Sequence, residues 1–481
     1  MVVTILRKAG IDMEHTPNEA PRTPNPRRRR RDPKRVFIQT YLIPIAILLV
    51  IILFIVFAIG SISRSNKRRE EERLASIAAE QSAAAAAQAL QQEANKLLVE
   101  ANRLAAGYNY DEAIALLDSF SGNVNDFSDL SIARARYLAE KDALVPWSDP
   151  NSIVNLSFHV LIADPNRAFK DADNGNSFRR NFITVSECTA ILTQLYENGF
   201  VLVNWDDVVQ TSVGADGTVT YSPATIYLPE GKKPLILTQT HVNYNTYMVD
   251  GNDDGLADKY GSGFASRLVL DSNGELTCEM VDSTGSVITG AYDLVPLLNT
   301  FIKSHPDFSY QGAKAILAVS GYDGLFGYRT DPETAKKINE DYYNQQLAEV
   351  PAIIDALRAD GYTIACYTYG NLAYGEAKIE SIETDLARWK TEVEPLLGKV
   401  DMLVYAKESD INDYTGDRYQ MLKNAGFKYF MSFSFDGKTY TQFTDEYVRQ
   451  GRILITGNRL ENKGDLYKGL FDALAVQDPS R

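Results

Sequence analysis

One stretch of the sequence places oxygen-bearing side chains at the spacing of a cation-binding loop. Positions 1, 3, 5 and 9 of a calcium loop are occupied by Asp250, Asn252, Asp254 and Asp258. Gly255 supplies the turn at position 6, and alternating carboxylate and amide oxygens suit a hard cation such as calcium. Position 12 is Gly261 instead of the usual bidentate Glu, so an ordinary turn rich in Asx and Gly is the alternative interpretation.

Imidazole side chains are scarce, which limits the acid–base and metal chemistry open to the chain. The four histidines are His15, His159, His241 and His305. His159 lies in an apolar segment, where we expect a hydrogen-bonded core residue. His241 follows a predicted strand, a position where sites form in parallel α/β folds. Asp206 and Asp207 also follow a strand, and we expect them to cap the next short helix.

A long apolar segment predicts a membrane anchor. No charged residue lies between Arg35 and Arg64, and these 28 residues are almost all apolar. A helix needs roughly 20 residues to cross a bilayer, so the segment predicts a transmembrane helix over 36–62. A cleavable signal peptide would have a shorter apolar region ending in small residues.

The flanks of this segment predict its orientation. Both flanks are basic, but the N-terminal one is more so, with five consecutive arginines at 27–31. The positive-inside rule therefore places the N-terminus in the cytoplasm and the C-terminal bulk outside the membrane. The tail over 1–35 is rich in Pro and Arg, and we expect it to be disordered and close to anionic lipid.

Charge and cysteine content exclude other classes. Residues 1–69 hold 14 Lys/Arg and 4 Asp/Glu, whereas the whole chain has a net charge of −14, so the part beyond the anchor is strongly acidic. This argues against nucleic acid as its main partner. Cys188, Cys278 and Cys366 are too few for a disulfide framework, although one bridge remains possible.

The segment after the anchor predicts a helical stalk over 63–145. Residues 69–106 contain no Gly or Pro and are rich in Ala, Gln, Glu and Leu, which favour helix. A heptad-like series is formed by Leu90, Ala94, Leu97, Ala101 and Leu104. Such a series permits self-association. Gly107 is expected to end this helix, Asp111 to cap a short one through Phe120, and a third is expected over 129–143.

Beyond Pro146 the pattern alternates between strands and helices. Strands are predicted at 153–162, 200–204, 235–238, 314–319, 363–369, 402–405, 429–433 and 452–456. Helices are predicted at 184–198, 294–304, 332–360, 379–397 and 418–425. This alternation predicts an α/β fold with a parallel sheet, open or closed into a barrel, with any chemistry at the carboxyl ends of its strands.

Seven landmarks between 151 and 462 resemble the polysaccharide deacetylase family, also called the NodB homology or carbohydrate esterase 4-like family. They lie at 158–164, 182–187, 199–208, 229–238, 312–317, 326–330 and 360–370. The resemblance implies a distorted (β/α) barrel of the NodB type over 146–481. It also implies a metal-dependent amide hydrolase acting on N-acetylated sugars, with one Asp and two His as zinc ligands and a second Asp as base.

The residues at those family positions differ from the family's own. The first motif reads Leu237-Thr-Gln-Thr-His241, which places Thr240 at the base and His241 at the ligand Asp. Tyr367 and Asn371 stand at the two ligand histidines, and neither suits zinc. In the third motif Asp410 looks retained, and no histidine follows His305 to serve as the acid.

These substitutions predict a membrane-anchored, catalytically degenerate deacetylase-like protein that binds cell-envelope polysaccharide or a partner protein. The first alternative is an active N-deacetylase of N-acetylated cell-wall polysaccharide, with a site rebuilt around His241 and with zinc or another divalent metal. In that case His241 would share a polar cleft with Asp410, Asp323 and Arg329. The second alternative is an oligomeric envelope scaffold that associates through the stalk. No cofactor is expected for the binder, apart from calcium at the loop above.

Overall fold

The structure, a computed structural model, describes residues 37, 41–249 and 261–481. The predicted tail over 1–35 and the predicted calcium loop at Asp250, Asn252, Asp254 and Asp258 therefore lie outside the described residues. Contacts divide the chain into two compact units, Met1–Ala89 and Leu90–Arg481.

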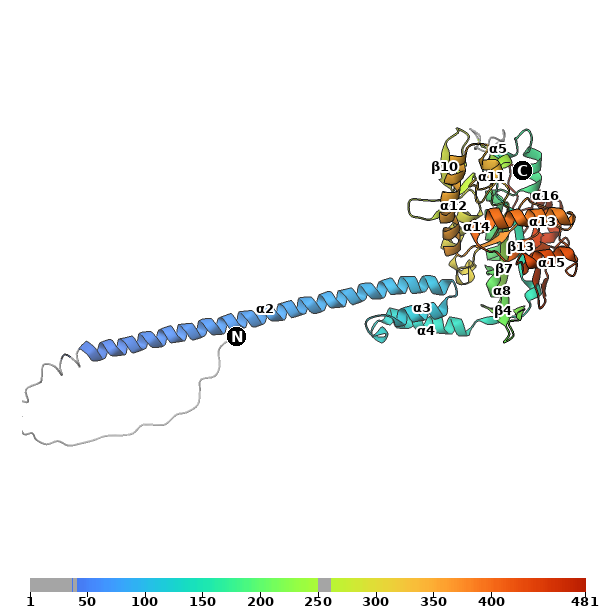
Figure 1. Ribbon diagram of the computed structural model, residues 1–481. Helices are drawn as coiled ribbons and strands as arrows, with labels where there is room; N and C mark the ends of the chain where they lie inside the picture. The colour runs from blue at the N-terminus through green and yellow to red at the C-terminus, as the bar shows by residue number, and fades with distance from the viewer. Residues whose placement is uncertain (1–36, 38–40, 250–260) are drawn as a thin grey trace, which may run out of the picture. The chain divides into compact units, whose positions relative to one another are not determined.

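The apolar segment from Ile43 onward and the first part of the predicted stalk form one helix, α2, at Ile43–Ala106 (Figure 1). Within the described residues it is the one helix long and apolar enough to cross a membrane, and its apolar part is exposed. It ends one residue before Gly107, as predicted.

Two further helices pack on the end of α2 that belongs to the second unit. They are α3 at Tyr110–Asp118 and α4 at Ser128–Asp142, which lie side by side in Figure 1. Helix α3 begins after Asn109, so Asp111 lies in its first turn and is not its cap, as the sequence had suggested. Ala94, Ala101 and Ala105 are buried on one face of α2, where small side chains allow close approach.

A closed barrel forms the centre of the second unit. Its strands are β2 (Val154–His159), β7 (Lys233–Thr240), β11 (Ile316–Val319), β12 (Thr363–Cys366), β13 (Met402–Val404), β14 (Tyr429–Phe433) and β16 (Val448–Leu454). Among the described residues, these seven strands pair in parallel in the order β11-β12-β13-β14-β16-β2-β7, and β7 pairs with β11 to close the ring. The predicted alternation is therefore a mixed α/β fold with a parallel barrel.

Short strands complete the sheet at its rim. Strand β3 (Phe200–Leu202) pairs with the first half of β7, and β11 pairs with its second half. Strand β15 (Thr441–Phe443) pairs antiparallel with β16. The sequence misplaced one strand, because β16 starts at Val448 and not at Arg452.

Antiparallel additions that the sequence did not predict lie outside the barrel. They are the pair β1–β6 (Val145–Trp147, Ile226–Leu228), the hairpin β4–β5 (Val209–Val213, Val219–Pro223), and the sheet β8–β9–β10 (Arg267–Leu270, Leu276–Val281, Val287–Gly290). Their alternating burial, with one face exposed, is typical of antiparallel sheets.

Helices cover the outer face of the barrel. The longer ones are α7 (Val185–Glu197), α10 (Leu294–Ser304), α12 (Glu340–Ala359), α13 (Ile379–Arg388) and α15 (Asp417–Asn424). The shorter ones are α5 (Pro165–Ala168), α6 (Gly175–Asn181), α8 (Trp205–Val208), α9 (Thr246–Val249), α11 (Pro332–Ala335), α14 (Glu394–Leu397) and α16 (Gly457–Asn462). The predicted helix at 332–360 is thus two helices, α11 and α12. Asp207 closes the capping box of α8 by accepting from the Asn204 N–H at 2.8 Å.

The three cysteines are buried free thiols that belong to strands or helices. Cys366 is on β12 and packs among the outward-facing apolar residues, whereas its neighbour Tyr367 belongs to the inner cluster. This follows from the alternation of side chains along a strand.

A buried ion pair fixes the start of α7. Glu187 forms a capping box with Thr184 and also accepts from Arg481 at 2.6 Å, and both charged side chains are almost fully buried. The Asp478 backbone N–H donates to the same carboxylate at 3.1 Å. The C-terminal segment is thereby held against the barrel.

Arg481→Ala should destabilise the fold because it leaves the Glu187 carboxylate buried without its cation. We expect a loss of about 3 to 5 kcal/mol in the free energy of unfolding, measured by urea denaturation of the full-length chain in detergent. Lys438→Ala breaks the exposed pair with Asp436 and is the control, with an expected loss below about 0.5 kcal/mol. Equal losses in the two variants would contradict this account.

Candidate functional site

A small cavity of about 150 Å³ opens at the carboxyl ends of the barrel strands. It is lined by His159, Thr240, His241, Tyr367, Asn371, Lys407, Glu408, Phe433, Arg452 and Leu454. These residues come from the ends of β2, β7, β14 and β16 and from the loops after β7, β12 and β13. The carboxyl end of a parallel barrel is where such folds place their sites.

A hydroxyl held between two imidazoles forms one wall of the cavity. Thr240 Oγ1 lies 2.6 Å from His159 Nδ1 and 3.3 Å from His241 Nδ1. The two rings meet edge to face with centroids 4.6 Å apart. On its other side, His241 Nε2 lies 3.4 Å from Asn371 Nδ2. His159 and Thr240 are paired across β2 and β7, so the strand register itself brings them together.

Both imidazoles are neutral near pH 7. Burial and, to a smaller extent, the charge of Lys407 lower the pKa of His241 from 6.5 to about 4. Burial also lowers the pKa of His159 well below its usual value, and His241, Arg452 and Arg459 add to this effect. Desolvation and nearby cations both disfavour the imidazolium.

Polar side chains continue from the cavity into the barrel interior. Arg452, which is 1% exposed, donates to Ser157 Oγ at 2.7 Å and to the Tyr405 carbonyl at 3.1 Å. One layer deeper, Asn155 accepts from Thr238 Oγ1 at 2.9 Å and donates to Gln450 Oε1 at 3.0 Å. Burial lowers the pKa of Arg452 to about 10, which leaves it charged at neutral pH.

Strained backbone is concentrated around the cavity. His241, Asn371, Lys407 and Glu408 all have positive φ, between 52° and 61°. Residues with a Cβ rarely adopt this conformation, and it costs on the order of 1 kcal/mol or more unless the surroundings impose it. Backbone strain of this kind is typical of functional sites.

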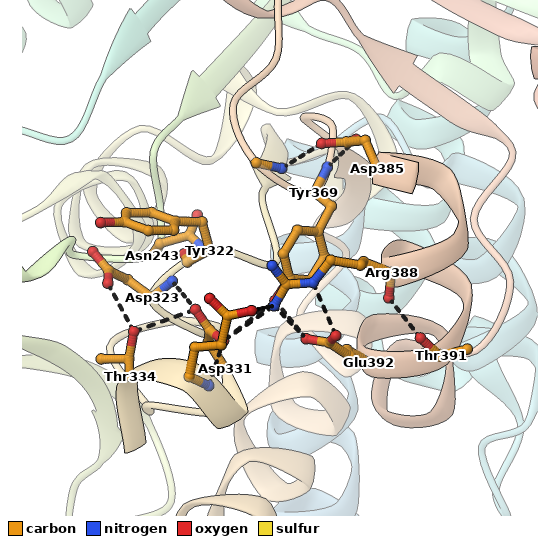
Figure 2. A network of polar contacts seen from close by, with 12 residues as sticks. Asn243, Tyr322, Asp323, Asp331, Thr334, Tyr369, Asp385, Arg388, Thr391 and Glu392 are labelled. Carbon is orange, nitrogen blue, oxygen red and sulfur yellow. Dashed lines mark hydrogen bonds and ion pairs between the residues drawn. The ribbon is translucent and has the colours of Figure 1, made fainter. Parts of the chain in front are cut away.

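The network in Figure 2 imposes the conformation of the loop after β12. Asp385 on α13 accepts from the backbone N–H groups of Tyr369 and Gly370, each at 2.7 Å, and from the Tyr374 hydroxyl at 2.6 Å. Arg388 stacks on the Tyr369 ring, with its guanidinium carbon 4.0 Å from the ring centroid. This loop carries Tyr367 and Asn371, so α13 positions two residues of the cavity.

The structure brings four of the residues singled out in the sequence into one place and separates the others. Thr240, His241, Tyr367 and Asn371 all line the cavity. Asp410 does not line it, because its carboxylate pairs with Arg449 at 2.7 Å and accepts from Ser432.

Of the residues expected to share a cleft with His241, none of Asp410, Asp323 and Arg329 lines the cavity described above. Asp323 is buried and accepts from the Thr246 backbone N–H at 2.9 Å and from its hydroxyl at 3.1 Å. Arg329 donates to the carbonyls of Asn243, Asp323 and Tyr244. These two side chains connect the loops after β7 and β11. Their charges are used in hydrogen bonds to backbone groups of these loops, as a buried charge requires.

Two important residues of the cavity were missed from sequence. His159 was interpreted as a core residue, but it ends β2 in the same row as Thr240. Arg452 was interpreted as the start of a strand, but it lies inside β16 and faces the barrel interior. A charged residue within an apolar strand was the available signal for Arg452.

The side chains present do not fit a zinc site of the kind implied by the resemblance. His159 and His241 both direct Nδ1 at Thr240, and Asn371 lies on the remaining nitrogen of His241. In the described ranges, which omit 1–36, 38–40 and 250–260, no group of three His, Cys, Asp or Glu side chains is close enough to hold a metal ion. Zinc needs at least three such ligands.

Comparisons with known proteins add a distant structural likeness. No protein-family model matches the chain, and no curated protein matches it significantly. Among solved structures, the Streptococcus pyogenes deacetylase PplD in complex with acetate is similar over 70% of this chain and 100% of that chain, with 10% sequence identity and a TM-score of 0.34. A TM-score this low assigns neither fold nor function, so the barrel assignment rests on the strand pairings themselves.

Acidification should destabilise the protein through its neutral imidazoles. The pKa of His241 is 6.5 in the unfolded chain and about 4 in the folded protein, so between these pH values the unfolded chain binds a proton that the folded protein does not. The free energy of unfolding is therefore highest above pH 6.5 and decreases as the pH falls toward 4. We expect His241→Gln to lose less stability than wild type between pH 7 and pH 4, by up to about 3 kcal/mol. Thermal unfolding of the full-length chain at both pH values measures this difference, and His305→Gln is the control. Parallel profiles for wild type and His241→Gln would contradict it.

Proposed function

We propose that this chain is a membrane-anchored, extracytoplasmic protein with a NodB-type deacetylase-like barrel that binds cell-envelope polysaccharide without hydrolysing it. The observation that carries the proposal is the side chain of Thr240. It stands between two imidazoles at the position where the resemblance implies a carboxylate base.

The chemistry of the cavity favours binding over hydrolysis. Amide hydrolysis needs a base that can take a proton from water near neutral pH, usually with a metal to polarise the carbonyl. A Thr hydroxyl is too weak an acid and too weak a base for that role. The pKa of His241, at about 4, makes its imidazole a poor proton acceptor at pH 7.

An exposed aromatic side chain beside the cavity supports sugar binding. Phe433 lines the cavity, and its ring centroid lies 6.3 Å from that of Phe435, which is 66% exposed. An aromatic face next to hydrogen-bonding groups suits the apolar face of a sugar ring and its hydroxyls. Binding would thus combine stacking on Phe435 with polar contacts from the cavity.

The proposed location follows from α2 and the basic residues that flank its apolar part. The excess of Arg before the apolar segment supports a cytoplasmic N-terminus and an extracytoplasmic barrel. The heptad-like series of α2 packs within the second unit, where Ala94 and Ala101 are buried and Leu90, Leu97 and Leu104 are partly buried, so self-association through it is no part of this proposal.

One contact favours a second candidate, an active hydrolase. Thr240 Oγ1 and His159 Nδ1 are 2.6 Å apart, the separation of a nucleophile and its base. The low pKa of His159, caused by burial and neighbouring cations, weakens it as a base.

Metal analysis and acetate release from chitin oligomers and peptidoglycan separate the two candidates. For the full-length chain in detergent we expect sedimentation with insoluble glycan, no stoichiometric zinc and no acetate release. Stoichiometric zinc with metal-dependent acetate release would overturn the proposed function, and acetate release without metal would favour Thr240 as a nucleophile.

Phe435→Ser tests the stacking surface in the same binding assay. We expect a roughly three- to tenfold loss of affinity, the scale of one aromatic contact. Leu474→Ser, which changes another exposed apolar side chain (72% exposed) outside the cavity, should bind as wild type does.

A further inference from the structure

We propose that the cavity at the barrel mouth binds a carboxylate group, with the Arg452 guanidinium as its counter-ion. This inference rests on the proposed binding function and specifies its ligand as an acidic saccharide. The carboxylate would enter the cavity, and the sugar ring would remain at its rim.

The first observation is a buried cation with no carboxylate within ion-pair distance. Arg452 is 1% exposed, yet in the described part of the chain it forms no ion pair. Its hydrogen-bond acceptors, Ser157 Oγ and the Tyr405 carbonyl, are neutral, and its guanidinium carbon lies 4.4 Å from the centroid of the Phe433 ring. Its Nε has no hydrogen-bond partner in the described structure. A buried charge is costly unless paired, and guanidinium has five N–H donors, so this side chain retains capacity for an anion.

The second observation is the charge balance of the cavity. Lys407 adds a second cation at the rim. Glu408 is the one carboxylate among the lining residues; it pairs with Arg459 and also attracts Arg452. Arg452, Lys407 and Arg459 against the single carboxylate of Glu408 leave an excess of positive charge around the cavity, which a bound anion would reduce.

The third observation is the set of neutral donors. Thr240 and Tyr367 present hydroxyls, Asn371 presents an amide, and the two imidazoles carry one N–H each in their neutral form. Together these groups surround the cavity with hydrogen-bond donors and add no negative charge.

Size and charge favour a carboxylate that is part of a larger ligand. About 150 Å³ is below the roughly 300–1,000 Å³ of pockets that enclose a whole small molecule, so one substituent fits and a sugar ring does not. Arginine binds a planar carboxylate in a bidentate manner. Phe433 and Leu454 provide apolar contact beside it.

The test is calorimetric titration of the full-length chain in detergent at pH 7 and constant chloride. The probes are acetate, glucuronate, glucose and inorganic phosphate. We expect glucuronate to bind more tightly than acetate, and glucose and phosphate to bind at least tenfold more weakly than glucuronate. Acetate that binds as tightly as glucuronate would identify a small free carboxylate as the ligand and overturn the acidic-saccharide assignment.

Three variants test the role of each charge. Arg452→Met should weaken glucuronate binding about 100-fold, the scale of charge-assisted hydrogen bonds, without lowering the thermal midpoint of the free protein. Lys407→Gln changes an exposed side chain and should weaken binding roughly threefold to tenfold with the fold intact. Lys438→Gln changes an exposed cation outside the cavity and is the matched control.

Two further results would overturn the inference. One is glucose binding as tightly as glucuronate, and the other is glucuronate affinity unchanged in both Arg452→Met and Lys407→Gln. The first result would leave the proposed glycan-binding function intact, whereas acetate release from glycan would overturn that function without touching the carboxylate site.

Discussion

Closure of the parallel barrel at β7 is the constraint on which the rest of the second unit depends. Strand β7 has β2 along one side and, along the other, β3 against its first half and β11 against its second. It therefore contributes inward-facing residues at every level, from Ile236 through Thr238 to Thr240. The interior of a barrel this small is filled by the inward-facing side chains of its strands.

The inward-facing side chains are polar on one side of the barrel and apolar on the other. Asn155, Thr238 and Gln450 form a hydrogen-bonded layer, Ser157 and Arg452 form the next, and His159 and Thr240 form the layer at the mouth. Opposite them, Ala318, Ala365 and Val404 belong to the apolar cluster. The cavity lies where the outermost of these polar layers reaches the surface. The strand pairings that close the barrel also fix the positions of its lining residues on β2 and β7.

Much of this arrangement could be predicted from sequence because it depends on local patterns. The apolar segment from 36 to 62, the Gly-free helix that follows and the β14 strand at Tyr429–Phe433 all follow from residue type and periodicity. Thr240 and His241 were singled out because they follow a strand and stand at family positions, and both line the cavity.

The rest could not be predicted because it depends on tertiary pairing. His159 resembles a core residue until the β2–β7 register places it opposite Thr240. Arg452 resembles a strand end until β16 is seen to begin at Val448. Asp410 and Asp323 have the right residue types for a site, but Arg449 and the backbone of Thr246 use their carboxylates.

The left-handed backbone of His241, Asn371, Lys407 and Glu408 affects how this site can diverge. At such positions Gly, Asn, Asp and His are accommodated at little cost, whereas β-branched residues are not. The choice of residue is thus restricted by backbone geometry before any ligand is considered. Exchange among these few residue types could change the side chains that line the cavity while the loops keep their backbone conformation. A small number of substitutions could then change which ligand the barrel binds.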